Sequence, residues 1–316
     1  MYYLRQIIEA ARLTNIDRGL HAEKEYLRWF PSLNGSYAIR ENFVARAGYY
    51  WSVGRPDLVQ YAGSLTLPDT ENPPAQNNRI TTNNAGIKAW SAATWKATLE
   101  YYFADVGVFS VSGFQREIKN FFGSTVFVPD AAFLALYGLE PAVYGRYDVS
   151  TQYNLPGKVR MSGVDFNYKQ ALTFLPSWAR GVQVFANGSA QRATGAAADN
   201  FSGYIPRTLN WGASLTRPGY TLRAKWNYAG RARRGVVAAG RSIEPGTYNW
   251  SSDRLLLDVN GEFTLRKNTA LFFNLTNLRD APNDTEVAGP TTPGLARLTQ
   301  RQTFGSLWTF GVRSTF

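Results

Sequence analysis

Three arginines stand close together in the stretch GRARRG, at residues 230–235, the densest basic cluster in the sequence. The guanidinium groups of Arg231, Arg233 and Arg234 offer planar forks of N–H donors that match a carboxylate or a phosphate. Tyr248 and Trp250 follow, and their rings could stack on a sugar or an aromatic solute. We take these five residues as candidate solute-binding residues. The alternatives are a solvated loop for the arginines and an interfacial position for the two rings.

Residues that support metal binding or nucleophilic catalysis are scarce. The chain has no cysteine and a single histidine, His21, which excludes a Cys/His metal site and a disulfide framework. A hydrolase would need a nucleophile and a base within hydrogen-bond reach, and we find neither such a pair nor a G-x-S-x-G motif. We therefore expect no enzyme activity, no metal site and no cofactor.

The charge of the chain is strongly positive but dispersed. The formal net charge is +11 and the mean hydropathy is -0.29. Lysines and arginines are scattered singly through alternating segments, and no basic tail or basic helix face is present, so we expect no nucleic-acid partner. The first residues, MYYLRQIIEAARLT, lack the features of a signal peptide, so a location outside the cytoplasm would require a further N-terminal segment.

The elements that must position these residues are strands, because apolar and polar residues alternate with a period of two from residue 28 to the end. In 221–230, one face carries Leu222, Ala224, Trp226 and Tyr228, and the other carries Thr221, Arg223, Lys225 and Asn227. The pattern predicts about eleven strands, at residues 28–39, 43–52, 92–104, 107–119, 160–173, 181–193, 207–217, 220–230, 253–266, 269–279 and 303–316. Strands of about ten residues are longer than those of most soluble proteins and suffice to cross a bilayer when tilted.

The connections between these strands alternate between short turns and long loops. Short connections fall at 40–43, 104–107, 175–181, 217–219 and 266–269, and long ones at 53–91, 120–159, 194–206, 231–252 and 280–302. This alternation is typical of outer-membrane barrels, which have short periplasmic turns and long extracellular loops. The aromatic content of 15% and the absence of an 18-residue apolar run agree with a membrane β-barrel and exclude a transmembrane helix. We expect apolar side chains to face lipid and charged ones to face the lumen.

The last predicted strand ends in LWTFGVRSTF, with Trp308, Phe310, Val312 and Phe316 on one face. That face is expected to lie in lipid, with the terminal Phe316 in an aromatic girdle. Residues 1–27 remain ambiguous, because 3–13 fit either a helix or a twelfth strand. Residues 130–148 form a loop with a helical start, and its apolar stripe (Ala131, Leu134, Ala135 and Leu139) could form a lid over the lumen or pack on neighbouring loops.

Five motifs resemble the β-barrel of the TonB-dependent outer-membrane receptors. They are YLRWFPSLNGSYAIRENFVARAGYYWSVGRPDL (26–58), LEYYFADVGVFSVSGFQREIKNFF (99–122), MSGVDFNYKQALTFLPSWARGVQVFANGS (161–189), FFNLTNLRDAP (272–282) and the final FGVRSTF. The resemblance covers nearly the whole chain from Tyr26. Ser314 departs from it, since an apolar residue is commoner there, and the plug and about half of the 22 strands of the family are missing.

The resemblance implies an all-β fold, a partial antiparallel transmembrane barrel of about 11–12 strands formed by 28–316. It implies active uptake of a scarce, large solute, such as a siderophore or a carbohydrate, across the outer membrane of a Gram-negative bacterium. The partners it implies are outer-membrane lipid and lipopolysaccharide, the TonB energy-coupling complex through the missing N-terminal region, and the barrel-assembly machinery through the C-terminal strand. Contact with lipopolysaccharide phosphates is then a further alternative for the arginines of GRARRG. We expect the chain to be a fragment that does not transport alone, with the inward charges Lys96, Glu100, Arg223, Lys225, Asp258 and Glu262 facing the plug or water. The alternative is a small complete porin-like barrel that passes solutes by diffusion.

Overall fold

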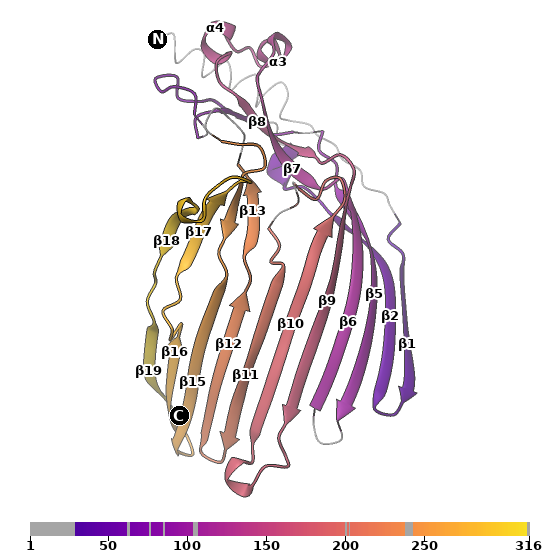
Figure 1. Ribbon diagram of the computed structural model, residues 1–316, viewed down its shortest axis with the longest axis vertical. Coiled ribbons are helices and arrows are strands. Elements are labelled where there is room, and N and C mark those ends of the chain that lie inside the picture. The colour runs from indigo at the N-terminus through magenta and orange to yellow at the C-terminus, as the bar shows by residue number, and fades with distance from the viewer. Residues whose placement is uncertain are drawn as a thin grey trace.

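The computed structural model describes residues 29–61, 64–75, 77–84, 86–103, 107–199, 201, 203–237 and 243–314. Its main element is an eleven-stranded, entirely antiparallel sheet that curves around one side of the molecule (Figure 1). The strands are, in order across this main sheet, β1 (Ser32–Arg40), β2 (Phe43–Gly54), β5 (Trp90–Phe103), β6 (Gly107–Lys119), β9 (Lys158–Ala171), β10 (Val182–Thr194), β11 (Arg207–Arg217), β12 (Tyr220–Ala229), β15 (Arg254–Arg266), β16 (Thr269–Thr276) and β19 (Leu307–Ser314).

All eleven strands were predicted from the alternation, and the bounds of β6 and β11 coincide with the prediction. The described short connections lie at the lower end of the sheet in Figure 1, and the described parts of the long connections lie at the upper end. The connection between β9 and β10 contains the short 3-10 helix η1 (Ser177–Ala179). Each remaining short connection joins two sequential neighbours of the sheet, so the sheet is an up-and-down meander.

The register of the strands separates the two faces of the sheet. Trp211, Trp226 and Leu257 lie opposite one another on three neighbouring strands, and the two tryptophan rings are parallel with centroids 6.1 Å apart. One residue further along, Lys225 lies opposite Asp258 on the other face, with Nζ 3.7 Å from the carboxylate. Because successive side chains of a strand point to opposite faces, the apolar residues form one face, called here the outer face, and the charged residues form the inner face.

The long connections contain more structure than the sequence indicated, because they were expected to be irregular loops. The first loop sheet consists of β3 (Leu65–Thr66), β4 (Ile80–Thr82), β8 (Val149–Asn154) and β7 (Phe122–Phe127). The second loop sheet consists of β13 (Ala232–Val236), β14 (Tyr248–Ser251), β17 (Asn283–Ala288) and β18 (Leu298–Gln302). Short helices complete the connections: α2 (Leu58–Tyr61), α3 (Ala131–Leu136), α4 (Pro141–Tyr144) and the 3-10 helix η2 (Gly294–Ala296).

The helical start predicted for residues 130–148 is present, but only two of the four residues of its predicted apolar stripe are buried. Asp130 caps α3 by accepting a hydrogen bond from the backbone N–H of Phe133. Leu134 and Leu139 are buried against Ile80 of β4, whereas Ala131 and Ala135 are exposed. The buried half of the stripe therefore packs on the first loop sheet, which agrees with packing on neighbouring loops rather than with a lid over the lumen.

A second apolar cluster covers the inner face near the upper end of the main sheet. Ala92, Ile118 and Val159 from three adjacent strands are almost fully buried there. Phe201, from the connection between β10 and β11, packs on the same cluster, and its ring centroid lies 4.5 Å from that of Phe121. This cluster holds the long connections over the upper end of the sheet.

The FFNLTNLRDAP motif ends β16 with a left-handed turn at Asn277, whose φ is 53°. Asparagine tolerates this conformation better than most residues, since its short amide can bond to the local backbone. Its side chain donates to the carbonyls of Ala281 and Gly305 and accepts from the N–H of Ala281. Its own backbone N–H donates to Asp258. The turn thus joins the end of β16 to the chain that leads into β19.

The main sheet does not close, since β1 and β19 each pair with a neighbour on one side within the described part of the chain. An open sheet is the outcome expected for a partial barrel. Among the described residues, no helix has the length and apolar character needed to cross a membrane. Residues 1–27, which the sequence left ambiguous between a helix and a twelfth strand at 3–13, and the terminal Phe316 lie outside the described residues.

Candidate functional site

The GRARRG stretch forms the start of β13, and a β-bulge separates its arginines. Arg233 lies opposite Trp250 and Gly235 lies opposite Asn249, so Arg234 is the extra residue of the bulge. A bulge of this kind re-aims a side chain relative to the rest of its strand. Arg234 is exposed and donates from Nε to the hydroxyl of Ser251 at 2.7 Å.

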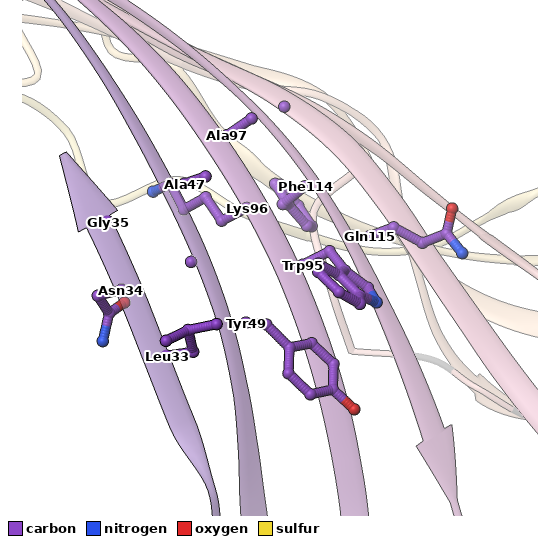
Figure 2. A pocket seen from close by; sticks show the side chains of 12 residues that line it. Leu33, Asn34, Gly35, Ala47, Tyr49, Trp95, Lys96, Ala97, Phe114 and Gln115 are labelled. Carbon is purple, nitrogen blue, oxygen red and sulfur yellow. The ribbon is translucent and has the colours of Figure 1, made fainter. Parts of the chain in front are cut away.

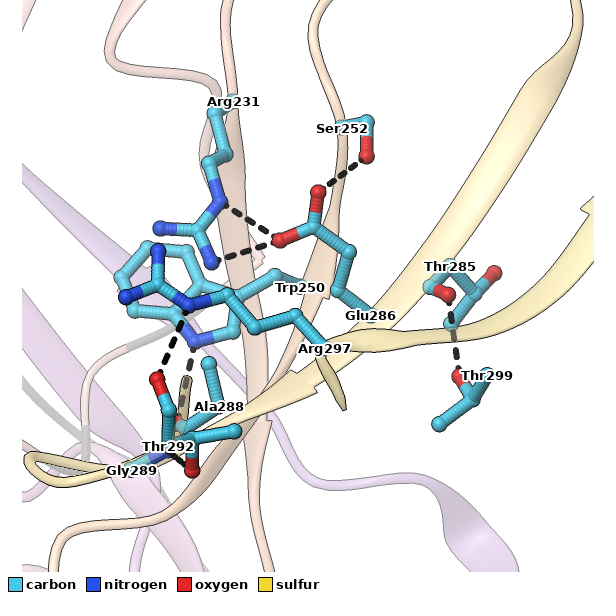
Figure 3. Close-up of polar contacts among 10 residues, drawn as sticks. All are labelled: Arg231, Trp250, Ser252, Thr285, Glu286, Ala288, Gly289, Thr292, Arg297 and Thr299. Carbon is cyan, nitrogen blue, oxygen red and sulfur yellow. Dashed lines mark hydrogen bonds and ion pairs between the residues drawn. The ribbon is translucent and has the colours of Figure 1, made fainter. Parts of the chain in front are cut away.

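Arg231 is engaged in the centre of a polar cluster in the second loop sheet (Figure 3). Its Nε and Nη2 both donate to one carboxylate oxygen of Glu286, at 3.0 and 2.7 Å. Its guanidinium carbon lies 4.1 Å from the centre of the Trp250 ring, a cation–π contact. The hydroxyl of Ser252 donates to the other oxygen of Glu286 at 2.5 Å. The hydrogen bond from Ser252, followed by Arg231, holds the pKa of the Glu286 carboxyl below its usual range against the opposing effect of burial.

Arg233 is engaged in a second, similar arrangement. Its guanidinium carbon lies 4.5 Å from the centre of the Tyr248 ring. Its Nη2 donates to the carbonyl oxygens of Ala198 and Phe201, and Nη1 lies 3.8 Å from a carboxylate oxygen of Asp199. Arg233 therefore ties the connection between β10 and β11 to the second loop sheet.

The five residues predicted from the sequence do lie together, on β13, on β14 or beside them. Two arginines, however, stack on the two rings and bind neighbouring protein groups. One face of each of Tyr248 and Trp250 is covered by a guanidinium group of this chain. The geometry favours an architectural role for Arg231, Arg233, Tyr248 and Trp250, and Arg234 is the member that faces an open space.

That space is a cleft of about 910 Å³ between the first loop sheet and β13. Aromatic rings and hydroxyl or amide groups of β7 and β8 form one wall, and the bulge at Arg234 forms part of the other. The lining residues that argue for a binding site are Arg79, Phe121, Phe122, Phe127, Tyr153 and Arg234. A cleft of this size at the loop end of the sheet suits a ligand with apolar rings and a polar or anionic part.

Arg79 gives the cleft a second cation whose donors are incompletely used. Its Nε is buried without a hydrogen-bond partner, and it lies 3.9 Å from a carboxylate oxygen of Asp148, beyond hydrogen-bond distance. A buried N–H of a charged group without a partner is costly. Asp148 also lines the cleft, so the two arginines outnumber the acid there.

The sequence analysis did not single out Arg79 or the aromatic pair Phe121 and Phe122. Arg79 lies in the connection between β2 and β5, which carries no alternation, and its partner Asp148 comes from a different connection. The pair FF did stand in the motif that ends at residue 122, where Asn120 has a φ of 56° and turns the chain out of β6. A cleft built from two distant loops leaves no local pattern.

Several inward charges of the main sheet form ion pairs between strands. Glu100 of β5 binds Arg46 of the adjacent β2 at 3.1 Å, and Glu262 of β15 binds Arg313 of β19, two strands away, at 2.6 Å. Asp258 binds Lys225, as described above. In the described part of the chain, no three His, Asp or Glu residues are grouped so as to hold a metal ion.

The comparison with protein families identifies the class of protein to which this fold belongs. The family described as "TonB dependent receptor-like, beta-barrel" matches residues 10–278. The chain therefore belongs to the β-barrel family of TonB-dependent receptors, as the motifs indicated. The family consists of receptors and transporters rather than enzymes, and its members are outer-membrane proteins of Gram-negative bacteria.

Solved structures of such receptors share the fold. A variant of the ferric enterobactin receptor of Pseudomonas aeruginosa in complex with enterobactin is 18% identical, with a TM-score of 0.62, over 91% of this chain and 41% of that chain. The ferric-catecholate import receptor Fiu of Escherichia coli K12 is 16% identical, with a TM-score of 0.55, over 90% of this chain and 34% of that chain. The copper transporter OprC is 14% identical, with a TM-score of 0.56, over 90% of this chain and 39% of that chain.

The chain thus spans about two fifths or less of the length of these receptors. Comparison with curated proteins gives no match.

Proposed function

We propose that this chain forms the C-terminal part of an outer-membrane receptor that takes up a scarce, large solute with energy from the TonB complex. Membership of the family is the observation that carries the proposal. Within the described residues, β1 and β19 are unpaired edges of the main sheet, which supports the view that further strands complete the barrel, since open edges are not tolerated in lipid. The TonB complex would then act through that further part of the protein.

We further propose that the cleft contributes to solute recognition at the outer end of the barrel. Arg79 and Arg234 would bind an anionic group, and the rings of Phe121, Phe122 and Tyr153 would contact apolar or aromatic parts of the solute. Receptors for ferric enterobactin and ferric catecholates, whose structures share the fold, fit a ring-bearing anionic solute. The outer face of the sheet, including Trp308, Phe310 and Val312, would contact lipid, and β19 would engage the barrel-assembly machinery.

The cleft is tested by removing its two cations together, with Arg79→Gln and Arg234→Gln. We expect affinity for a panel of ferric siderophores, measured on the purified receptor, to fall about tenfold or more, because each charge-assisted hydrogen bond contributes about 1.5–3 kcal/mol. The matched control removes two cations at the opposite end of the sheet, with Arg266→Gln and Lys267→Gln, and should change affinity less than about twofold.

Unchanged affinity in the cleft variant would refute the site while leaving the receptor function intact. TonB-independent uptake of the bound solute would refute the receptor function itself.

A further inference from the structure

Each of the two loop sheets borders the cleft with an edge strand. β7 is the last strand of the first loop sheet and β13 is the first strand of the second; within the described residues, β7 pairs only with β8 and β13 only with β14. All six residues of β7 line the cleft, together with Arg234, Gly235 and Val236 of β13. Because successive side chains of a strand point to opposite faces, a cleft lined by every residue of β7 runs along the backbone edge of that strand.

The register of β7 and β8 determines which backbone groups of β7 point away from β8. Just before β7, the N–H of Leu155 donates to the carbonyl oxygen of Phe121 at 2.7 Å, in register with the pairing that follows. In an antiparallel pair, hydrogen-bonded residues alternate with residues whose N–H and C=O groups point outward. Phe122, Ser124 and Val126 are therefore the residues that present an N–H and a C=O at the free edge. In the described part of the chain, no backbone group outside the sheet bonds to them.

The edge of β7 lacks the features that usually prevent a further strand from pairing, which are a proline, a charged side chain or a bulge. Its sequence, FGSTVF, contains neither proline nor charge, and its pairing with β8 is regular. β13 has the bulge at Arg234, and the carbonyl oxygen of Arg233 already accepts a hydrogen bond from the N–H of Gly203. At the other edges of the loop sheets, β18 carries Arg301 and β3 has only two residues. Among the described edges of the loop sheets, β7 is therefore the one suited to pair with a further strand.

The edges of the main sheet border a different environment. Leu33 and Gly35 of β1 line a hollow of about 700 Å³ with Tyr49 and Trp95 of the next two strands (Figure 2). Tyr49 and Trp95 lie opposite one another on the outer face, which would contact lipid in the proposed barrel. The edges of β1 and β19 would pair with the further strands of that barrel, whereas nothing in the proposed barrel pairs with β7.

The charge of the cleft favours an acidic partner for this edge. Arg79 and Arg234 both line the cleft, and Arg234 is exposed. Asp148 is the one acid among the described lining residues. Because a guanidinium group binds a carboxylate through two parallel N–H···O bonds, a strand that carries an acidic side chain or a terminal carboxylate complements the cleft.

We propose that the cleft binds an extended acidic peptide, as long as the six residues of β7, which adds to the edge of β7 as a further strand of the first loop sheet. The peptide backbone would bond to Phe122, Ser124 and Val126, and its carboxylate to Arg79 or Arg234. In strand addition, main-chain hydrogen bonds give the affinity and alternate side chains give the selectivity.

The inference rests on the solute-recognition role proposed for the cleft and names the class of solute. A peptide with an acidic and an aromatic side chain is one form of the anionic, ring-bearing solute described above. A compact chelate without a peptide backbone would use the two arginines and the rings but not the edge of β7. The backbone hydrogen bonds therefore distinguish the two classes of solute.

The first test measures the binding of hexapeptide libraries to the detergent-purified receptor. One library has a fixed aspartate among otherwise random residues, and the other has a lysine at the same position. We expect the receptor to retain peptides from the aspartate library, and the tightest of them to bind at least about tenfold more strongly than the same peptide with lysine. Retention of no peptide from the aspartate library, or equal affinity for the lysine counterpart, would overturn the proposal.

The second test removes backbone donors from the tightest peptide by N-methylation of alternate residues, which leaves its side chains unchanged. The two alternate sets are compared, because only one edge of an added strand faces β7. We expect one set to weaken binding at least about tenfold and the other less than about threefold. Equal effects of the two sets would contradict strand addition.

A matched pair of variants tests the same edge from the side of the protein. Ser124→Pro removes an N–H of the free edge, and an edge strand tolerates proline where the missing N–H faces away from its partner. Ser124→Ala removes the hydroxyl group and keeps that N–H. We expect Ser124→Pro to weaken peptide binding about fivefold or more and Ser124→Ala less than about twofold. Wild-type affinity in Ser124→Pro would overturn the proposal, and the N-methylated peptides give the same test on the unchanged protein.

The outcomes also separate this inference from the proposed function. If the combined Arg79→Gln and Arg234→Gln variant loses affinity for ferric siderophores while no peptide binds the wild type, the peptide class is wrong and the role of the cleft stands. If peptides bind through the edge of β7 but their uptake does not need the TonB complex, the inference stands and the receptor function is wrong.

Discussion

At the scale of single residues, the arginines of GRARRG have side chains that often bind ligands, but here two of them hold neighbouring connections together. Arg231 and Arg233 each lie on an aromatic ring and bind acceptors from other connections. In an antiparallel pair of strands, a residue also contacts the residue two positions away from the one directly opposite it. The pairing of β13 with β14 therefore places Arg231 on Trp250 and Arg233 on Tyr248. The spacing of Arg231 and Arg233, and of Tyr248 and Trp250, follows from this diagonal packing.

The carboxylate of Glu286 makes the stability of the second loop sheet depend on pH. Its pKa in the folded protein lies below the unfolded value, because Ser252 and then Arg231 favour the ionised form. Arg301 lowers the pKa of Asp284 in the same way. The stabilisation is therefore complete above the unfolded carboxyl pKa of about 4 and is lost as the pH falls through the lower folded values.

We expect hydrogen exchange in β14 and β17, corrected for its intrinsic pH dependence, to accelerate below about pH 4. Glu286→Gln should exchange faster at pH 7 and respond less to acid, because the group that titrates has been removed. Combining it with Asp284→Asn should remove most of the remaining response. The explanation fails if Glu286→Gln keeps the acid response of the wild type.

At the scale of elements, glycines and aromatic rings face each other across adjacent strands. On the two sides of β16, Phe272 lies opposite Gly311 of β19 and Phe273 lies opposite Gly261 of β15. A β carbon on either glycine would come within 2.5 Å of the opposing ring. Each ring thus covers the backbone of the neighbouring strand, which fixes the register on both faces of β16.

Gly311→Ala is therefore expected to destabilise the β16–β19 pair by roughly 1–3 kcal/mol, the usual cost of overpacking. The measurement is the midpoint of denaturant-induced unfolding. Gly35→Ala, where an added β carbon meets no atom within 4 Å, is the matched control and should change the midpoint little. Phe272→Leu added to Gly311→Ala should recover part of the loss, and a failure of this rescue would contradict the packing explanation.

The main sheet could be predicted from the sequence because each of its strands has an apolar face and a polar face. Apolar and polar residues therefore alternate along the strand with a period of two. The alternation of Leu222, Ala224 and Trp226 with Arg223 and Lys225 identifies both the strand and its two faces. The loop sheets could not be predicted in this way. Strands such as β3 and β13 have two and five residues, too few for a period to emerge, and their partners come from other connections.

The candidate site could also be predicted only in part, because its residues come from distant parts of the sequence. The sequence indicated Arg234 because it stands in a cluster, but Arg79 and Phe121 enter the cleft from connections far away in the chain. Their proximity depends on the parallel pairing of β4 with β8, which joins the two connections in one sheet. A non-local pairing of three residues carries no signal in a single sequence.

At the scale of the whole molecule, the number of strands decides how the barrel can close. Because neighbouring strands of the main sheet are antiparallel and there are eleven of them, β1 and β19 run in the same direction. Direct pairing of β1 with β19, within one copy or between two copies of the same orientation, would be parallel. Bacterial outer-membrane barrels are antiparallel with an even number of strands. Closure therefore requires an odd number of further strands between these edges.

The chain has been interpreted as a small complete barrel or as part of a 22-stranded receptor. Both interpretations add an odd number of strands, but they differ in barrel size. A twelfth strand from residues 3–13, which lie outside the described residues, would give a narrow twelve-stranded barrel. Eleven further strands would give the 22 expected from the family resemblance. The wide barrel is the one that follows from the function proposed above, and the chain spans 41% of the ferric enterobactin receptor whose fold it shares.

We therefore expect the chain, exported alone to the periplasm of a strain that lacks the matching receptor, to form no closed barrel and to restore no TonB-dependent uptake. The edges of β1 and β19 would stay unpaired, which is costly in lipid and promotes aggregation in water. Closure is measured by the shift in gel mobility on heating that closed outer-membrane barrels show, and uptake by growth on a limiting solute with and without a functional TonB complex. Growth that does not need TonB, together with a heat-dependent shift, would support the small diffusion barrel. A heat-dependent shift with TonB-dependent growth would show that the chain is sufficient by itself, and the requirement for further strands would be wrong.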